Sequence, residues 1–293
     1  MSSPPPAERY PSAPLVALDT LWFQVAGTLC NIACTHCFIS SSPTNRSHGM
    51  LSQADVRRRL VEAEALGVRE YYFTGGEPFL NPEIFPILEE TLVRGPVTVL
   101  TNGLLLNRDR CRRLKSLFEE SEYSLDLRVS IDGYTAEAND PIRGSGTFDR
   151  ILLGIRNLAE AGLNPVVTVT EACADAATAD GRSRFLDWMR EVGLTRPRLK
   201  VLSLFRIGAE ETRLRAYESW ETLRDRELTA GEAEALQCSS CRMVTARGVY
   251  VCPILIDEPA AKMGESLADT LRPFGLKFSS CFTCHEYGVT CRT

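Results

Sequence analysis

Residues 21–37 read LWFQVAGTLCNIACTHC, an apolar run followed by a loop that carries three cysteines. The apolar run 21–26 predicts a short buried strand that ends before Gly27. Cys30, Cys34 and Cys37 then follow with C-x3-C-x2-C spacing. Iron–sulfur clusters are normally held by four thiolates, so a set of three would leave one iron open to a small molecule. The alternatives are unlinked buried thiols or a zinc site, although zinc usually takes a fourth cysteine or histidine.

Strands and helices alternate outward from this stretch. Such alternation predicts a parallel sheet with right-handed crossovers. Six strand–helix units are too few for a closed eight-stranded barrel, so we expect an α/β fold with an open or partial barrel. The strands are expected at 21–26, 68–74, 97–101, 125–131, 165–170 and 198–204, and the helices at 52–66, 82–94, 108–119, 148–161 and 182–192.

Polar residues follow several of these strands. The carboxyl ends of parallel strands meet at one edge, where sites of α/β folds usually lie. We therefore expect one rim to gather the cysteine loop with Gly75-Gly76-Glu77, Thr101-Asn102-Gly103 and Asp132-Gly133.

Composition narrows the class of protein. The chain has 293 residues and a net charge of −5, and it has no sustained run of Lys or Arg, so we expect neither nucleic acid nor a membrane surface as a partner. No apolar stretch approaches the roughly 20 residues that cross a bilayer. Nine of the eleven cysteines fall in two groups and no export signal precedes them, which favours metal binding or catalysis in the cytoplasm over disulfides.

Gly75-Gly76-Glu77-Pro78 follows the second expected strand. Together with the cysteine loop, this motif resembles the radical S-adenosylmethionine (SAM) superfamily. In that family the three cysteines bind a 4Fe–4S cluster whose open iron takes the amino and carboxylate groups of SAM. The resemblance covers residues 20–204 and implies a partial (β/α)6 TIM-like barrel. It also implies reductive cleavage of SAM to a 5′-deoxyadenosyl radical, and a flavodoxin or ferredoxin as electron donor.

The resemblance further implies which residues contact SAM. Gly75, Gly76 and Glu77 would meet the methionine amine, because glycines allow close approach and a carboxylate suits an ammonium group. Ser130 and Asp132 would contact the ribose, although ordinary strand-end residues would look the same. Arg143 would contact the SAM carboxylate, unless it is a solvated loop residue. Phe38 would lie near adenine, and the weaker pocket candidates are Thr101, Asn102 and Thr170.

The second group of cysteines lies near the end of the sequence. Its paired CxxC motifs fit a zinc ribbon, but after a radical SAM barrel they resemble the auxiliary-cluster domains called SPASM and twitch. The group has too few cysteines for the full SPASM pattern, which has seven, and for two complete clusters, which need eight. We therefore expect one auxiliary 4Fe–4S cluster and leave open a second, incompletely ligated one. The expected ligands are one or both of Cys238 and Cys241 with Cys252, Cys281 and Cys284, which leaves Cys291 spare.

Three segments are expected. Residues 1–18 form a flexible tail, 19–205 the radical SAM barrel, and 206–293 a small cysteine-rich domain. In the last segment we expect charged helices at 209–237 and a hairpin at 242–252 around Arg247-Gly248. Because little apolar sequence remains there for a core, metal is expected to hold this domain together.

The chemistry expected from these features is hydrogen-atom abstraction from a small polar substrate, such as a sugar or aminocyclitol. The enzyme would be an oxidoreductase or isomerase that dehydrogenates or epimerises it, and in an epimerisation Cys291 could return a hydrogen atom. A dehydrogenation needs a base, which the sequence does not identify. The alternatives are a peptide- or protein-modifying enzyme and, in another class, a non-catalytic zinc-binding scaffold.

Overall fold

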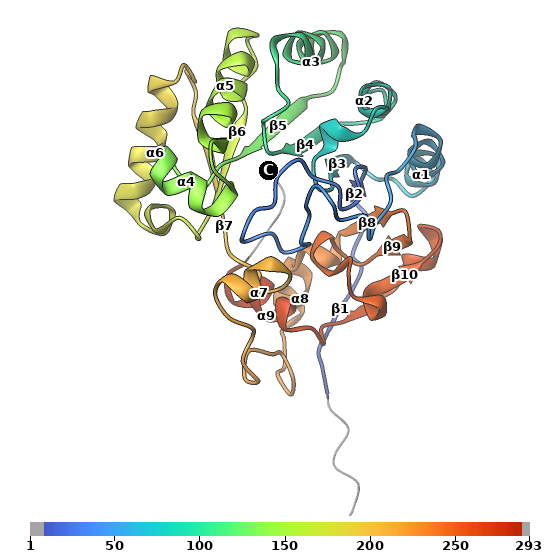
Figure 1. Ribbon diagram of the computed structural model, residues 1–293. Helices are drawn as coiled ribbons and strands as arrows, with labels where there is room; N and C mark the ends of the chain where they lie inside the picture. Colours follow the sequence, from blue (N-terminus) through green and yellow to red (C-terminus); the bar gives the residue numbers. More distant parts are fainter. Residues whose placement is uncertain (1–8, 289–293) are drawn as a thin grey trace, which may run out of the picture.

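The computed structural model describes residues 9–288, and its main sheet has the strand order β10-β9-β8-β2-β3-β4-β5-β6-β7. All neighbouring pairs from β2 to β7 are parallel, as the alternation predicted. The sheet curls into a partial barrel with helices on its outer side (Figure 1). The predicted fold class is therefore confirmed. The six strands are β2 (Thr20–Gln24), β3 (Glu70–Thr74), β4 (Val97–Thr101), β5 (Leu125–Ser130), β6 (Val166–Thr170) and β7 (Arg198–Leu202).

The outer helices agree with the predicted ones to within three residues at each end. Ser52 caps the first of them, and Asp55 completes a capping box, as the sequence indicated. A helix at Ala136–Arg143 (α4) was missed because Pro141 lies inside it. The five predicted helices are α1 (Gln53–Ala65), α2 (Ile84–Leu92), α3 (Arg108–Glu120), α5 (Thr147–Glu160) and α6 (Ala179–Glu191).

Side chains of β2 alternate between two environments. Leu21 and Phe23 belong to the main apolar core. Trp22 and Gln24 instead line a cavity inside the barrel, because successive side chains of a strand point to opposite faces. The same alternation brings Ser130 of β5 and Thr170 of β6 to that cavity.

The C-terminal segment continues the barrel sheet. β8 (Cys241–Thr245) pairs in parallel with β2, and the expected hairpin forms between β8 and β9 (Gly248–Tyr250), followed by β10 (Lys262–Gly264). In Figure 1 this segment lies below the barrel in orange and red. The expectation that it lacks an apolar core is wrong, since a second buried cluster contains Trp22, Tyr72, Met243, Tyr250, Leu255, Leu276 and Phe282.

Two further expectations are wrong. Residues 209–237 form only two short helices, α7 (Ala209–Arg213) and α8 (Ala230–Ala235), because buried Glu221 pairs with Arg206 and Arg215 across a folded loop. Within the expected tail, β1 (Ser12–Ala13) pairs antiparallel with β11 (Phe274–Gly275). The last helix, α9 (Ser279–Glu286), carries Cys281 and Cys284. None of the helices between residues 9 and 288 has the length and hydropathy to span a bilayer.

Candidate active site

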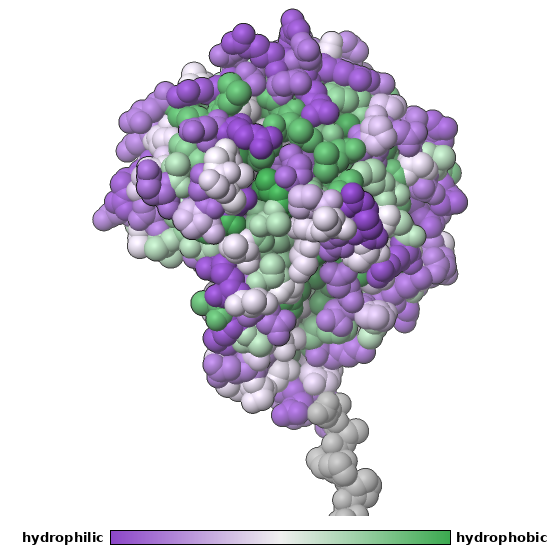
Figure 2. Space-filling view, viewed as in Figure 1, coloured by the Kyte–Doolittle hydropathy of each residue, from purple (hydrophilic) through white to green (hydrophobic). Residues whose placement is uncertain are grey.

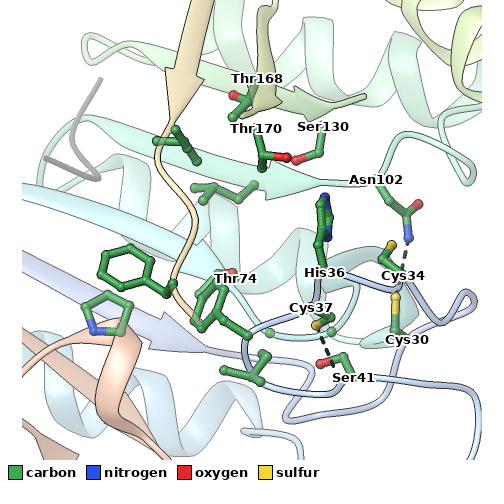
Figure 3. Close-up of a pocket in the computed structure, with 18 of the residues that line it drawn as sticks. Cys30, Cys34, His36, Cys37, Ser41, Thr74, Asn102, Ser130, Thr168 and Thr170 are labelled. Atoms are coloured by element: carbon green, nitrogen blue, oxygen red, sulfur yellow. Dashed lines mark hydrogen bonds between the residues drawn. The ribbon is translucent and has the colours of Figure 1, made fainter. Parts of the chain in front are cut away.

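The cysteine loop and the carboxyl ends of the strands enclose a cavity of about 220 Å³. Figure 3 shows Cys30, Cys34 and Cys37 on one side of it and Ser130 and Thr170 on the other, with His36 between them. The structure thus brings together residues that the sequence placed on one rim. The predicted residues on its wall are Cys30, Cys34, Cys37, Phe38, Gly75, Gly76, Thr101, Asn102, Ser130, Arg143 and Thr170.

Gly76 allows the end of β3 to lie against the cysteine loop. Its N–H donates to the carbonyl of Gly27 (2.8 Å), and the next N–H, of Glu77, donates to the carbonyl of Leu29 (3.0 Å). A Cβ at Gly76 would lie 2.1 Å from the Leu29 carbonyl oxygen. The sequence predicted that this glycine allows close approach to a ligand; the structure shows close approach to the cysteine loop itself.

The three thiols are suited to hold iron. Burial raises the pKa of Cys30 to about 11 and that of Cys34 to about 12. Iron binding requires thiolates, so each needs stabilisation of its charge. Asn102 Nδ2–H donates to Cys30 Sγ (3.5 Å), and the N–H of Ser41 donates to Cys37 Sγ (3.3 Å). Three thiols beside one cavity, two of them with N–H donors, fit a cluster with one open iron.

Glu77 lies behind the cavity wall. It is fully buried, and its carboxylate accepts hydrogen bonds from Thr101 Oγ1 (2.8 Å) and from the backbone N–H groups of Asn102 (2.8 Å) and Phe79 (3.1 Å). Burial raises its pKa, whereas these three donors lower it. In the structure Glu77 positions the end of β4, and with it Asn102 next to Cys30, whereas its contact with the SAM amine stays a prediction.

Asp132 also lies behind the wall, at the centre of a buried network. Its Oδ2 accepts from His36 Nε2 (2.6 Å) and pairs with Arg143 Nε (2.7 Å), while its Oδ1 accepts from Thr170 Oγ1 (2.6 Å). Burial opposes ionisation, but Arg143 and His36 outweigh it and hold the pKa of Asp132 below its usual range. Asp132 orients Arg143 and His36, which face the cavity, and its contact with the ribose stays a prediction. Arg143 is buried rather than solvated.

Sequence reasoning missed the residues inside the barrel. Trp22 and Gln24 of β2 line the cavity, as do Arg128 and Thr168, whose side chains hydrogen-bond to each other (3.4 Å). The sequence offered one signal for these residues. Gln24 is a polar residue within an apolar strand, and it lies two residues after Trp22, so the two side chains point to the same face of the sheet.

Much of the cavity wall is apolar. Met243 of β8 and the segment that follows the hairpin form part of it, and Phe205 packs near Phe38 with ring centroids 6.2 Å apart. In Figure 2, apolar residues gather towards the middle of the face of the molecule that is shown, with hydrophilic residues around its edge. The apolar residues of the wall are Trp22, Ile32, Phe38, Ile39, Leu100, Leu202, Leu204, Phe205, Met243, Pro253, Ile254 and Ile256.

A second, smaller cavity of about 30 Å³ lies within the C-terminal segment. Four thiols line it, from Cys238, Cys252, Cys281 and Cys284. Burial raises the pKa of Cys238 to about 11 and that of Cys281 to about 12, and raises that of Cys252 as well. Cys241 lies outside the cavity wall, and its thiol approaches the carbonyl of Val251 (3.9 Å).

Two further observations concern the cysteines. No set of three or more His, Cys, Asp or Glu side chains within residues 9–288 is arranged around a single metal ion. The ten cysteines in that range are all outside disulfides. Cys291, the expected hydrogen donor, lies outside the described residues.

Comparison with known proteins identifies the family. The model of the radical SAM superfamily matches residues 25–172, half of the chain. This chain belongs to the radical SAM superfamily. The family's cofactors, a 4Fe–4S cluster and SAM, are therefore those of this protein.

Several known proteins are similar to this chain in sequence or in fold. The mycofactocin maturase MftC of Mycobacterium tuberculosis is 36% identical over 134 residues, which are 45% of this chain and 32% of that protein. The chain thus matches about a third of the length of this relative. Streptococcus suis SuiB bound to the precursor peptide SuiA has a TM-score of 0.63, 16% identity, and coverage of 90% and 65%. anSMEcpe with bound AdoMet and the Cp18Cys peptide has a TM-score of 0.60, 15% identity, and coverage of 86% and 79%.

Proposed function

We propose that this protein is a radical SAM enzyme that modifies a peptide or protein. The observation that carries the proposal is that Cys30, Cys34 and Cys37 share one cavity with Gly75 and Gly76 at the carboxyl ends of the strands. The peptide-bound SuiB and anSMEcpe structures, which share the fold, support a peptide over the small polar substrate expected from the sequence, and MftC is by its name a maturase. The apolar residues of the cavity wall support the same choice.

We assign the residues of the site the following roles. When bound, the cluster and SAM supply reductive cleavage and a radical that removes a hydrogen atom from the substrate. Cys30, Cys34 and Cys37 hold the cluster, and the donor from Asn102 stabilises a thiolate. Arg143, held by Asp132, presents a cation to the SAM carboxylate, and the apolar wall excludes water from the reacting carbon.

The C-terminal segment supports an auxiliary cluster of the SPASM or twitch kind. Four thiols are the number that a 4Fe–4S cluster takes, and Cys238, Cys252, Cys281 and Cys284 line one cavity. We propose Cys238 as a ligand because it lines this cavity; Cys241, the alternative expected from the sequence, lies outside the cavity wall but interacts with Cys252. Residues 206–293 would form this auxiliary module beside the barrel of 19–205, and a flavodoxin or ferredoxin would supply electrons.

Replacing Cys252 with alanine should remove one cluster. Anaerobically reconstituted wild-type protein is expected to hold about eight irons, and Cys252→Ala about four. Cys111→Ala is the matched control, because Cys111 is buried in the barrel core away from both cysteine cavities. Iron analysis and EPR of the reduced protein measure the cluster content of both variants. Eight irons in Cys252→Ala would contradict the proposed ligand set.

Turnover tests the enzymatic proposal. Reconstituted protein given dithionite and SAM should form 5′-deoxyadenosine and methionine, measured by mass spectrometry, and Cys34→Ala should form neither. With peptides whose side chains are perdeuterated, deuterium should enter 5′-deoxyadenosine. Deuterium from a perdeuterated sugar alone would favour the small-molecule alternative. Colourless, zinc-loaded protein without cleavage would support the scaffold.

A further inference from the structure

Two side chains of β2 carry buried polar groups without partners in the described part of the chain. Gln24 is fully buried, and neither its Nε2 nor its Oε1 has a hydrogen-bond partner. Trp22 is 1% exposed, and its indole N–H has none. Buried polar groups in folded proteins are normally hydrogen-bonded, and leaving them unpaired is costly. Both side chains line the active-site cavity, so these groups are available to whatever occupies it.

The strand fixes the direction of both side chains. Gln24 pairs in register with Thr74 of β3, and Trp22 with Met243 of β8. The Trp22 ring stacks on Tyr72 with centroids 4.3 Å apart, which holds the indole in place. Leu21 and Phe23, of opposite parity, are anchored in the apolar core. The free polar groups are therefore preorganised towards the cavity.

Their strand lies apart from Ser130 and Thr170, which line the polar part of the cavity, although Gln24 is in register with Thr74, directly before Gly75 and Gly76. Ser130 and Thr170 lie on β5 and β6, and β3 and β4 stand between these strands and β2. Three strand spacings from β2 to β5 amount to roughly 14 Å along the sheet. On its other side, β2 adjoins β8 and the apolar residues Met243, Ile254 and Ile256. Gln24 and Trp22 thus lie between Gly75 and Gly76 on one side and these apolar residues on the other, where a substrate would lie beside SAM.

We infer that Gln24 and Trp22 bind an amide group of the substrate, next to an apolar side chain that packs on Met243, Ile254 and Ile256. This inference rests on the proposed peptide-modifying function. A carboxamide offers a donor and an acceptor side by side, which match the C=O and N–H groups of a peptide. A sugar would also need partners for its other hydroxyls, which the apolar wall lacks. Gln24 and Trp22 therefore determine specificity for an apolar residue within a peptide.

A binding experiment tests this inference without turnover. The probe is N-acetyl-L-leucine N′-methylamide, titrated calorimetrically and anaerobically into the reconstituted protein with SAM. We expect Gln24→Met to weaken binding at least tenfold. The corresponding methyl ester, which lacks the C-terminal N–H, should bind wild type more weakly than the amide does. In Gln24→Met the amide and the ester should bind alike, because the acceptor for that N–H is gone.

Controls separate the possible outcomes. Gln53→Met makes the same chemical change on α1, outside the cavity wall, and should leave probe binding unchanged. Gln24→Met should melt no lower than wild type, since it removes unpaired polar atoms; Gln24→Glu provides a second variant that keeps the shape and loses the donor.

Equal probe binding by Gln24→Met and wild type, or weaker binding of SAM alone, would overturn the inference. N-acetylglycine N′-methylamide binding as tightly as the leucine probe would overturn the apolar part. Failure of the enzymatic proposal would appear separately, as wild type that binds the probe but forms no 5′-deoxyadenosine.

Discussion

Gly76→Ala is expected to abolish SAM cleavage. The new Cβ would lie 2.1 Å from the carbonyl oxygen of Leu29 and 2.8 Å from the backbone N of Cys30, and both are backbone atoms. The cysteine loop would have to move away from β3, which displaces Cys30 from Asn102 and the other thiols. Overpacking of this kind typically costs about 1–3 kcal/mol of stability. We expect loss of the SAM-binding cluster, seen as a fall to about four irons, and no detectable 5′-deoxyadenosine.

Gly231→Ala is the matched control for that variant. Gly231 lies in α8, and a Cβ there would meet nothing within 4 Å. Alanine favours a helix over glycine by up to about 1 kcal/mol, so this variant should be as stable as wild type or slightly more. Iron content and SAM cleavage should be those of wild type. A Gly76→Ala protein with full iron and activity would show that the loop tolerates the displacement.

Asp132→Asn is expected to cause the largest loss of stability among these variants. Asp132 and Arg143 are both buried, and the substitution leaves the guanidinium without its counterion. Breaking a buried ion pair in this way costs about 3–5 kcal/mol. Urea unfolding of the protein without cofactors should show this difference at neutral pH. Weaker SAM binding should accompany it, because Arg143 loses the group that orients it.

The pH dependence of this effect has a definite sign. The pKa of Asp132 is held below its usual range in the folded protein, so its carboxylate contributes stability above the unfolded pKa of about 3.9 and loses it at lower pH. The difference between wild type and Asp132→Asn should therefore shrink as the pH falls below about 4.

The control for Asp132→Asn is Asp126→Asn, which removes a half-exposed ion pair with Arg198 (2.7 Å). Such a surface pair contributes about 0–1 kcal/mol. Equal losses in the two variants would contradict the proposed role of the buried network.

The sequence predicted the barrel well because its signals are local. Apolar runs such as 97–101 become strands wherever they are covered, and Ser52 and Asp55 cap a helix through contacts three residues apart. The cysteine loop and Gly75-Gly76 could also be found, because a cluster ligand set and a close backbone approach each demand particular residues at fixed spacing. The failures at 209–237 and at the N-terminus come from long-range pairing: Glu221 with two arginines, and β1 with β11.

The amino-acid sequence by itself determined the fold class, the family's cysteine loop and the residues that follow the strands at the rim of the cavity. Only the tertiary structure decided what those residues face. Glu77 and Asp132 turn away from the cavity to hold Asn102 and Arg143, whereas Gln24 turns into it. The physical reason is that a side chain's partners are set by neighbouring strands and by burial, which bring together groups as distant as Asp132 and His36.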